Sequence, residues 1–403
     1  MGRSRLSLAF VVAVAAAAAA TFLLRPRSGL IEPAPVDAQQ YFTAAQLDRA
    51  EDFRDLQRVL GLAGLGIGIG TLAVLAWRPP QGALRRLESR PLLGGAAAGA
   101  GISLVLVVTG LPVRAWMRSR ALDVGLATQS WPDYAVDVVK GAGIGAVTAA
   151  VGGLVAMALV RRFPRHWWAP ASVLVVAYGV VTIWLYPIVI DPVFNTFEKL
   201  PKGQLRAEVL RLADRAGVDV GEVYRVDASR RTSAANAYVI GLGHSKRVVL
   251  YDNLIDDFPR DDLRVVVAHE LGHQKHDDLL RGLAWLAIVA PAGTFLAQAL
   301  AERFARGRRL ATPVALPAIA LAIALVGLGL GCASNTLSRR VEASADSFAL
   351  ELTDDAQGFI DFERRISLSN ISDPNPPELL HVLFDTHPTT LQRLGAGEAW
   401  RAK

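Results

Sequence analysis

The chain has 403 residues, of which 52% are hydrophobic and only 20% are charged, and its mean hydropathy is +0.31. So much apolar surface excludes an intrinsically disordered protein, and the single cysteine, Cys332, excludes an intrachain disulfide and a cysteine-rich metal site. The net charge of +6 does not indicate nucleic acid as a partner, because the basic residues lie mostly between apolar runs. That distribution is typical of an integral membrane protein.

A helix that crosses the roughly 30 Å hydrocarbon layer of a membrane needs about 20 apolar residues. Seven segments of the chain meet or approach that length, and most have uncharged interiors and charged flanks. In chain order they are Leu6–Leu24, Val59–Trp77, Leu92–Leu111, Gly141–Val160, Trp168–Ile190, Leu279–Ala301 and Val314–Ala333. The sequence therefore predicts about seven membrane spans.

The first apolar segment has two interpretations. Arg3 and Arg5 before an apolar run are typical of a cleaved signal peptide. The run, however, ends at Arg25 and Arg27, which make a good stop at a membrane surface, and this favours a retained span. The charged, amphipathic residues 25–58 that follow predict a loop with a short surface helix.

Two later segments are too polar for a membrane. Residues 191–278 mix charge, glycine and proline with short β-branched runs, and residues 334–403 are polar. We therefore divide the chain into an N-terminal membrane region of about five spans (1–190), a first domain part (191–278), a two-span hairpin (279–333) and a second domain part (334–403). The predicted fold is mainly α: a polytopic helical membrane bundle that carries one small α+β domain, assembled from both parts.

The pattern HExxH occurs at residues 269–273. On a helix, positions i and i+4 lie on one face, so His269 and His273 can bind one metal ion. Glu270 lies about 100° around the helix from His269, beside the open metal position. Zinc lowers the pKa of a bound water toward about 7, and Glu270 can take its proton as general base. The pattern predicts hydrolysis at a zinc site; a helix that merely contains two histidines is the alternative.

A catalytic zinc site needs three protein ligands. His276, Asp277 and Asp278 are the next candidates after the motif, but Glu342 is the better one, because Asp346 lies four residues later on the same helix face. A ligand glutamate with an aspartate one turn away can also hold a ligating imidazole in the right tautomer. A solvated amphipathic helix is the alternative. Two spans separate His269 from Glu342, so both are expected on the same side of the membrane.

The chain resembles the type I CAAX prenyl endopeptidase family, whose members are integral-membrane zinc metalloproteases of the gluzincin type. The matching segments cover about residues 186–394 in family order, and the first 160 residues resemble the family only in hydropathy. These segments are Tyr186-Pro-Ile-Val-Ile-Asp-Pro-Val-Phe-Asn195, Asn236-Ala237-Tyr238, His269-Glu-Leu-Gly-His273, Ser338-Arg339 with Glu342 and Ala345-Asp346, and Thr386-His387-Pro388 with Arg393.

The resemblance implies one zinc ion per chain, with His269, His273 and Glu342 as its ligands. It also implies that Glu270 is the catalytic base. We therefore expect zinc-dependent hydrolysis of peptide bonds without a covalent intermediate.

Four further residues gain expected roles from the resemblance. Asp346 is expected to support a ligand from behind or to donate a proton. His387 is expected near the scissile carbonyl, where an imidazole N–H can stabilise the oxyanion. Arg339 and Arg393 are expected either to hold a substrate carboxylate or to pair with Asp346, and the sequence does not separate these two roles.

Residues 238–251 predict a β-hairpin with a glycine-containing turn. An exposed edge strand there could bind an extended peptide by strand addition; a structural hairpin that covers the site is the alternative. The resemblance favours Asn236, Ala237 and Tyr238 as the edge that faces the substrate.

The expected function is that of a membrane zinc metalloendopeptidase whose partners are the lipid bilayer and a protein or peptide substrate. A chain rich in Ala, Gly, Arg and Val is typical of a GC-rich bacterial genome, which favours the bacterial plasma membrane and membrane-associated or misfolded proteins over prenylated substrates. The distribution of Lys and Arg favours an active site outside the cell, whereas the family favours the cytoplasmic face. The sequence decides neither this nor the oligomeric state.

Three other functions fit parts of the sequence. An inactive scaffold of the same fold is disfavoured because every residue needed for catalysis is present. A transporter or channel is disfavoured because the spans hold almost no ionisable residues. A site-2-type intramembrane protease would place HExxH inside a membrane helix, but here Asp261, Asp262 and Arg264 precede the motif and Lys275 follows it.

Overall fold

A computed structural model describes residues 2–241 and 246–403 of the chain. Among these residues, seven helices are long and apolar enough to cross a membrane. They are α1 (Gly2–Leu24), α2 (Ala44–Trp77), α4 (Pro91–Asp123), α5 (Trp131–Arg162), α6 (Trp168–Leu185, continued by Tyr186–Ile190 and α7, Asp191–Phe194), α11 (Asp278–Phe304) and α12 (Leu316–Thr353). Seven helices match the seven predicted spans.

Two of these helices extend well beyond the predicted spans. Helix α2 begins at Ala44, where the sequence predicts a loop with a short helix, and continues unbroken into the membrane span. Its polar half is held by the second domain part (334–403), because Ala50 and Phe53 pack on Ile371 and Arg58 pairs with Asp373 at 2.6 Å. The hydropathy of the sequence marks only the apolar half of such a helix.

Helix α12 likewise continues through residue 334, where we placed the border between the two-span hairpin and the second domain part. One rigid element therefore joins the seventh span to the segment that contains Glu342 and Asp346. The position of these two carboxylates is fixed by the span itself rather than by a separate helix outside it.

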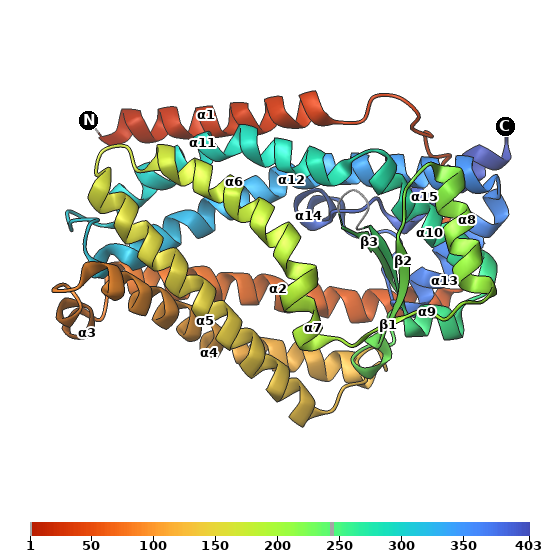
Figure 1. Cartoon of the computed structure of the whole chain (residues 1–403), viewed down its shortest axis with the longest axis horizontal. Helices are drawn as coiled ribbons and strands as arrows, with labels where there is room; N and C mark the ends of the chain where they lie inside the picture. Colours follow the sequence, from red (N-terminus) through yellow and green to blue (C-terminus); the bar gives the residue numbers. More distant parts are fainter. Residues whose placement is uncertain (1, 242–245) are drawn as a thin grey trace.

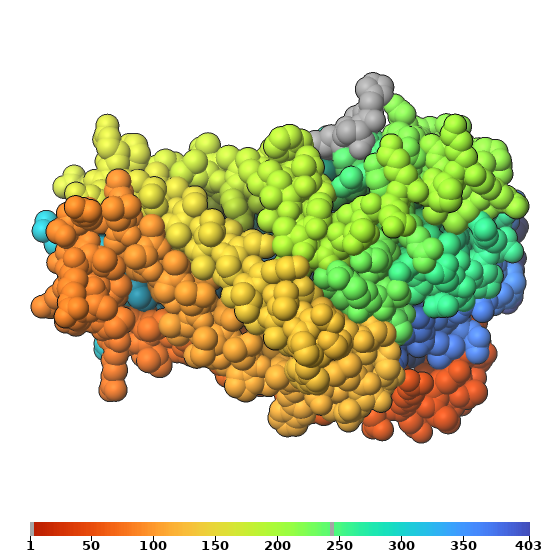
Figure 2. Space-filling view, turned by 60° about the horizontal axis from the view of Figure 1, so that its bottom comes forward, coloured from red at the N-terminus to blue at the C-terminus, as the bar shows by residue number. Residues whose placement is uncertain are grey.

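The spanning helices differ in how deeply they are packed. Half of the most apolar window of α11 and of α12 is buried, compared with 22% or less for the other spans. Helix α11 contacts α1, α6 and α12, whereas α12 also contacts α2 (Figure 1). Helices α4 and α5 pack closely on each other along the lower side of the bundle in Figure 1, and α3 (Gln81–Arg86) lies at its left end. Figure 2 shows the outer surface of α4 to α6, which runs toward the small sheet.

Helices α4 and α5 approach so closely because glycines face each other at their crossing. A Cβ on Gly153 of α5 would lie 2.2 Å from the carbonyl oxygen of Gly95 in α4, and a Cβ on Gly99 would lie 2.1 Å from that of Ala149. Small residues allow this backbone contact, which is typical of helix pairs in membranes.

A four-stranded sheet with the order β1-β2-β4-β3 forms the centre of the small domain. Its strands are β1 (Phe197–Lys199), β2 (Glu222–Val226), β3 (Ala237–Ile240) and β4 (Arg247–Tyr251). Strands β2 and β4 are parallel, whereas β1 and β3 join antiparallel. The predicted pairing of β3 with β4 is confirmed, and β3 lies at an edge of the sheet. The turn of this hairpin, at 242–245, lies outside the described residues.

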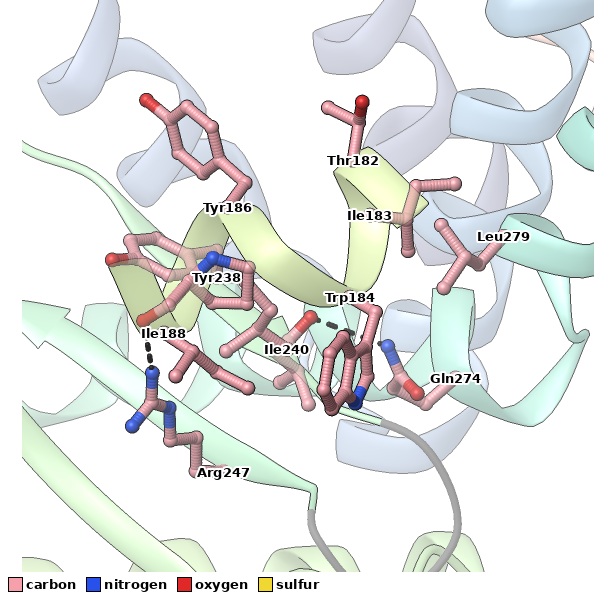
Figure 3. A pocket seen from close by; sticks show the side chains of 13 residues that line it. Thr182, Ile183, Trp184, Tyr186, Ile188, Tyr238, Ile240, Arg247, Gln274 and Leu279 are labelled. Atoms are coloured by element: carbon pink, nitrogen blue, oxygen red, sulfur yellow. Dashed lines mark hydrogen bonds between the residues drawn. The ribbon is translucent and has the colours of Figure 1, made fainter. Parts of the chain in front are cut away.

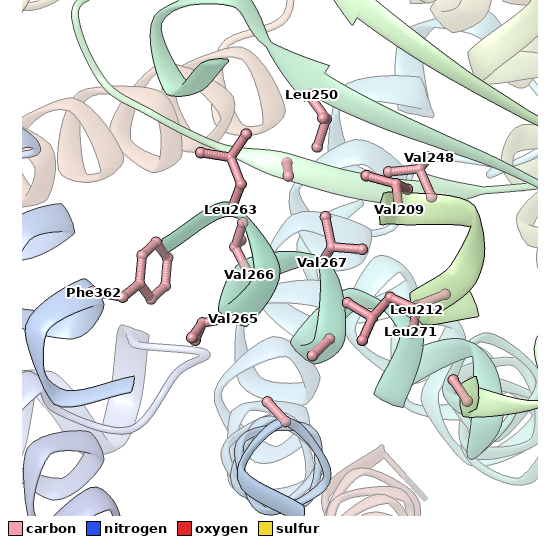
Figure 4. Packing of buried hydrophobic residues seen from close by; sticks show 14 of the residues in the cluster. Val209, Leu212, Val248, Leu250, Leu263, Val265, Val266, Val267, Leu271 and Phe362 are labelled. Atoms are coloured by element: carbon pink, nitrogen blue, oxygen red, sulfur yellow. The ribbon is translucent and has the colours of Figure 1, made fainter. Parts of the chain in front are cut away.

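Helices from both parts of the domain lie around the sheet (Figure 1). They are α8 (Gln204–Ala216), α9 (Asp252–Asp257), α10 (Arg260–Lys275), α13 (Ala356–Ser369), α14 (Glu378–Phe384) and α15 (Thr390–Arg401). The largest buried cluster joins α8, β4, α10 and α13 through Leu212, Leu250, Leu271 and Phe362 (Figure 4). The predicted fold class, a helical membrane bundle with a small α+β domain, is confirmed.

Candidate metal centre

Helix α10 holds the HExxH motif in the middle of the domain core. Pro259 precedes the helix and Asp261 and Asp262 lie in its first turn, where negative charge favours the positive end of the helix dipole. The run Val265–Ala268 is buried, so the core fixes the rotation of the helix about its axis. His269 and His273 consequently project together toward α12.

Three side chains converge where α10 faces α12. His269 Nε2 lies 3.2 Å from His273 Nε2 and 3.3 Å from Glu342 Oε2, and His273 Nε2 lies 3.7 Å from Glu342 Oε1. Each residue offers one ligand atom, and these atoms all lie within 4.8 Å of one another. Close packing of Gly272 against Ala345 allows the two helices to approach, since a Cβ on Gly272 would lie only 3.2 Å from the Ala345 Cα.

The outer nitrogen of each imidazole has a carboxylate partner. His269 Nδ1 donates to Asp346 Oδ1 at 2.8 Å, and His273 Nδ1 donates to Asp278 Oδ2 at 3.0 Å. Because each carboxylate accepts the Nδ1 proton, the Nε2 atom of each ring, beside Glu342, is the one available to a metal ion. Asp278, the first residue of α11, was considered in the sequence only as a possible ligand.

The donor set fits a divalent metal ion of the zinc type. Two neutral imidazoles and one carboxylate at metal–ligand lengths of about 2.0–2.2 Å in a tetrahedron would be about 3.3 Å apart, close to the separations seen here. Burial lowers the pKa of His269, but hydrogen bonds to Asp346 and Glu342 outweigh it and raise that pKa to about 10. A metal therefore competes with protons for these nitrogens.

Behind the metal centre lies a buried chain of charges that crosses three helices. Arg393 of α15 donates to Asp346 Oδ2 at 2.9 Å, and its guanidinium also lies 2.9 Å from Glu363 Oε1 of α13. Asp346 and Glu363 are each about 2% exposed. Burial raises the pKa of Glu363, the charge of Arg393 opposes that rise, and the negative charge of Asp346 adds to it. Of the two roles open for Arg393, the structure displays pairing with Asp346.

Glu270 interacts electrostatically with all three ligand residues and also contacts the sheet edge. Its carboxylate accepts a hydrogen bond from the backbone of Val239 in β3. Burial raises the pKa of Glu270, and the neighbouring histidines oppose that rise. A carboxylate in this setting can hold a proton that it takes from a group bound between β3 and the metal centre.

The residues expected to face the substrate lie on or directly before β3. Asn236 Oδ1 accepts from the backbone N–H of Ala237 at 2.9 Å, and Ala237 itself is buried. The Tyr238 hydroxyl donates to Asp191 Oδ2 at 2.9 Å, which ties the strand to the end of the fifth span. Burial, together with the negative charge of Asp191, raises the pKa of this hydroxyl. The edge strand thus has a fixed position relative to both the membrane and α10.

His387 contacts the metal centre, and Arg339 lies about one turn before Glu342 on α12. The side chain of His387 is 59% exposed, and its Nε2 lies 3.3 Å from Glu342 Oε2. Arg339 donates to the carbonyl oxygens of His381, Val382 and Asp385 at 2.7–3.2 Å, and so holds the end of α14 just before His387. The structure brings His387 to the site. It places the Arg339 guanidinium against the backbone of the segment that precedes His387.

A cavity of about 580 Å³ lies beside β3 (Figure 3). Its walls come from the end of the fifth span (Thr182–Trp184 and Tyr186–Ile188), from β3 and from the first turn of α11. Trp184, Ile240 and Leu279 give it a mainly apolar lining, while Gln274 and Arg247 supply the polar groups. The sequence did not predict Gln274 or Glu363 as parts of the site, and it offered Asp278 only as a possible ligand. Only the position of Gln274, directly after the motif, could have indicated it.

The fold and the site define a membrane-embedded metallopeptidase, and comparisons with known proteins agree. Residues 199–401 match the model of peptidase family M48, and residues 70–196 match that of the CAAX prenyl protease N-terminal region with five membrane helices. The chain therefore belongs to peptidase family M48, in the CAAX prenyl protease branch, and it is a multi-pass membrane protein.

Relatives are found in bacteria and eukaryotes. An uncharacterized metalloprotease of Bacillus subtilis, YhfN, is 29% identical over 74% of this chain and 71% of its own length. A CAAX prenyl protease 1 homolog of Arabidopsis thaliana is 31% identical over 54% of this chain and about half of its own length. The crystal structure of S. mikatae Ste24p superimposes with a TM-score of 0.70 at 18% identity, over 98% of this chain and 99% of that one, and shows that the two share a fold.

Proposed function

We propose that this protein is a zinc endopeptidase that hydrolyses peptide bonds in extended polypeptides bound along β3. The observation that carries the proposal is the convergence of His269, His273 and Glu342 beside Glu270, which itself contacts the edge strand. When bound there, one zinc ion per chain supplies Lewis acidity and lowers the pKa of water.

The side chains of this chain supply the remaining steps. Glu270 takes the proton of the attacking water on its carboxylate and later delivers it to the leaving amine. His387 lies beside Glu342, where its imidazole N–H can stabilise the oxyanion of the substrate carbonyl. Asp346 acts through His269, whose orientation it fixes by accepting the Nδ1 proton.

Two arginines hold other groups of the site in place. Arg393 holds Asp346 from behind, and Arg339 holds the segment before His387. Neither role requires contact with a substrate carboxylate. Asn236, Ala237 and Tyr238 present the strand edge to the substrate backbone, which gives binding without dependence on a particular side chain.

The substrates that this geometry favours are membrane-associated or misfolded proteins with an extended segment. The relatives called CAAX prenyl proteases make a prenylated C-terminus the second class to test. The Bacillus relative, in turn, supports a bacterial plasma membrane as the location. An intramembrane site-2-type mechanism is disfavoured, because α10 is not among the helices long and apolar enough to span.

The test is cleavage of unfolded casein and of a prenylated C-terminal peptide in detergent, by wild type and by Glu270→Gln. We expect wild-type activity that a chelator removes and zinc restores. The variant should retain zinc but lose at least about a hundredfold in rate, the typical contribution of a general base. Full activity in Glu270→Gln would refute the assigned base, and zinc binding without any cleavage would favour the inactive scaffold.

A further inference from the structure

The edge strand β3 has two residues whose backbone groups face away from the sheet. Tyr251 N–H donates to the carbonyl of Asn236, and the register pairs Ala237 with Leu250 and Val239 with Val248. Antiparallel pairs alternate between bonded and non-bonded, so the N–H and C=O of Ala237 and Val239 point outward. A substrate strand added to this edge would normally bond to both residues.

Side chains of helix α10 already bond to the backbone of the second of these residues, Val239. Gln274 Nε2 donates to the Val239 carbonyl at 3.2 Å (Figure 3), and the Val239 backbone also bonds to the Glu270 carboxylate. Residues 270 and 274 are one helical turn apart, so a single face of α10 caps both backbone groups of Val239. The Ala237 carbonyl faces outward beside this cap.

We propose that Gln274 is a specificity-determining residue that ends the strand pairing between β3 and a substrate at Ala237. The inference rests on the proposed function and adds how many backbone hydrogen bonds β3 forms with the substrate. The Ala237 N–H already donates to the Asn236 side chain. With the Val239 carbonyl taken by Gln274, a substrate segment therefore bonds only to the Ala237 carbonyl. The enzyme therefore acts on short extended segments and gains nothing from a longer strand.

The surroundings of Gln274 support this role. Its side chain also lines the apolar cavity beside β3, together with Trp184 and Leu279 (Figure 3). Shortening Gln274 to alanine removes the donor and at the same time leaves space next to the Val239 carbonyl. That carbonyl then becomes available to a substrate N–H.

The experiment compares a cleavable peptide with versions extended by two residues on its N-terminal or its C-terminal side. For each enzyme, the measured quantity is the ratio of kcat/KM between extended and unextended peptide. We expect a ratio near one in wild type and about a two- to tenfold increase, for one of the two extensions, in Gln274→Ala and Gln274→Ser, which is what one net hydrogen bond contributes. The neighbouring, exposed Lys275→Ala is the matched control and should keep the wild-type ratio.

A scan with N-methylated peptides tests the same idea without a mutation. The scan leaves the scissile amide unmethylated. In wild type, methylation of only one of the other backbone amides, the one that pairs with Ala237, should lower kcat/KM. In Gln274→Ala, a second amide two residues away should become sensitive. Two sensitive amides in wild type, or equal extension ratios in wild type and both Gln274 variants, would overturn the inference. Absence of zinc-dependent cleavage of the unextended peptide by wild type would instead refute the proposed function, and the inference with it.

Discussion

Replacing Asp278 by asparagine is expected to weaken zinc binding without unfolding the domain. The Asp278 carboxylate accepts the Nδ1 proton of His273 at 3.0 Å, and its side chain is only 7% exposed. Asparagine is nearly the same size and can still accept through its amide oxygen. The change therefore removes the charge that makes the imidazole a stronger ligand, and it leaves the packing in place.

The magnitude follows from the burial of this contact. A buried hydrogen bond to a charged group contributes about 1.5–3 kcal/mol. Loss of an outer partner of a metal-binding histidine typically costs about ten- to a hundredfold in affinity, which corresponds to about 1.4–2.7 kcal/mol. The two ranges overlap, so we expect the dissociation constant for zinc to rise by about ten- to a hundredfold in Asp278→Asn.

The assay is competition for zinc between the purified protein and a chromophoric chelator in detergent at fixed pH. Asp277→Asn is the matched control, because it removes the same charge one residue earlier from an exposed side chain. Asp277 has a positive φ of 52°, a conformation that asparagine also tolerates. Equal affinities for the two variants would refute the idea that Asp278 acts through His273.

Two further predictions concern stability, measured as the thermal unfolding midpoint in detergent. Burial raises the pKa of Glu363 in the folded chain above the ordinary carboxyl value of about 4.3. Between these two pKa values, the folded chain binds a proton that the unfolded chain lacks. Stability should therefore fall as pH rises through this window; Glu363→Gln should flatten that slope, and an unchanged slope would contradict the reasoning. Gly153→Ala should cost about 1–3 kcal/mol, because its Cβ would collide with the carbonyl oxygen of Gly95. Gly152→Ala, which meets open space, should cost nothing, and equal losses in both variants would argue against the close crossing of α4 and α5.

The sequence predicts those features of this protein that depend on local periodicity. Hydropathy over about 20 residues marks the seven spans, because the membrane requires an apolar length whatever the neighbours are. The i, i+4 spacing of His269 and His273, and that of Glu342 and Asp346, fixes a shared helix face before any tertiary contact forms. Alternation and a glycine-containing turn likewise indicate the pairing of β3 with β4.

Tertiary structure alone decides which groups from other helices, strands and segments contact the residues in these local patterns. The polar half of α2 carries no membrane signal, and it is helical because the 370–373 segment packs and pairs with it. Arg393 pairs with Asp346 because α15 and α13 enclose both side chains, where an unpaired buried charge would be costly. Asp278 reaches His273 because the chain turns sharply between α10 and α11, and Gln274 meets Val239 because the shared core presses α10 against the sheet edge. Contacts between separate elements depend on how those elements pack, and no period in the sequence records that packing.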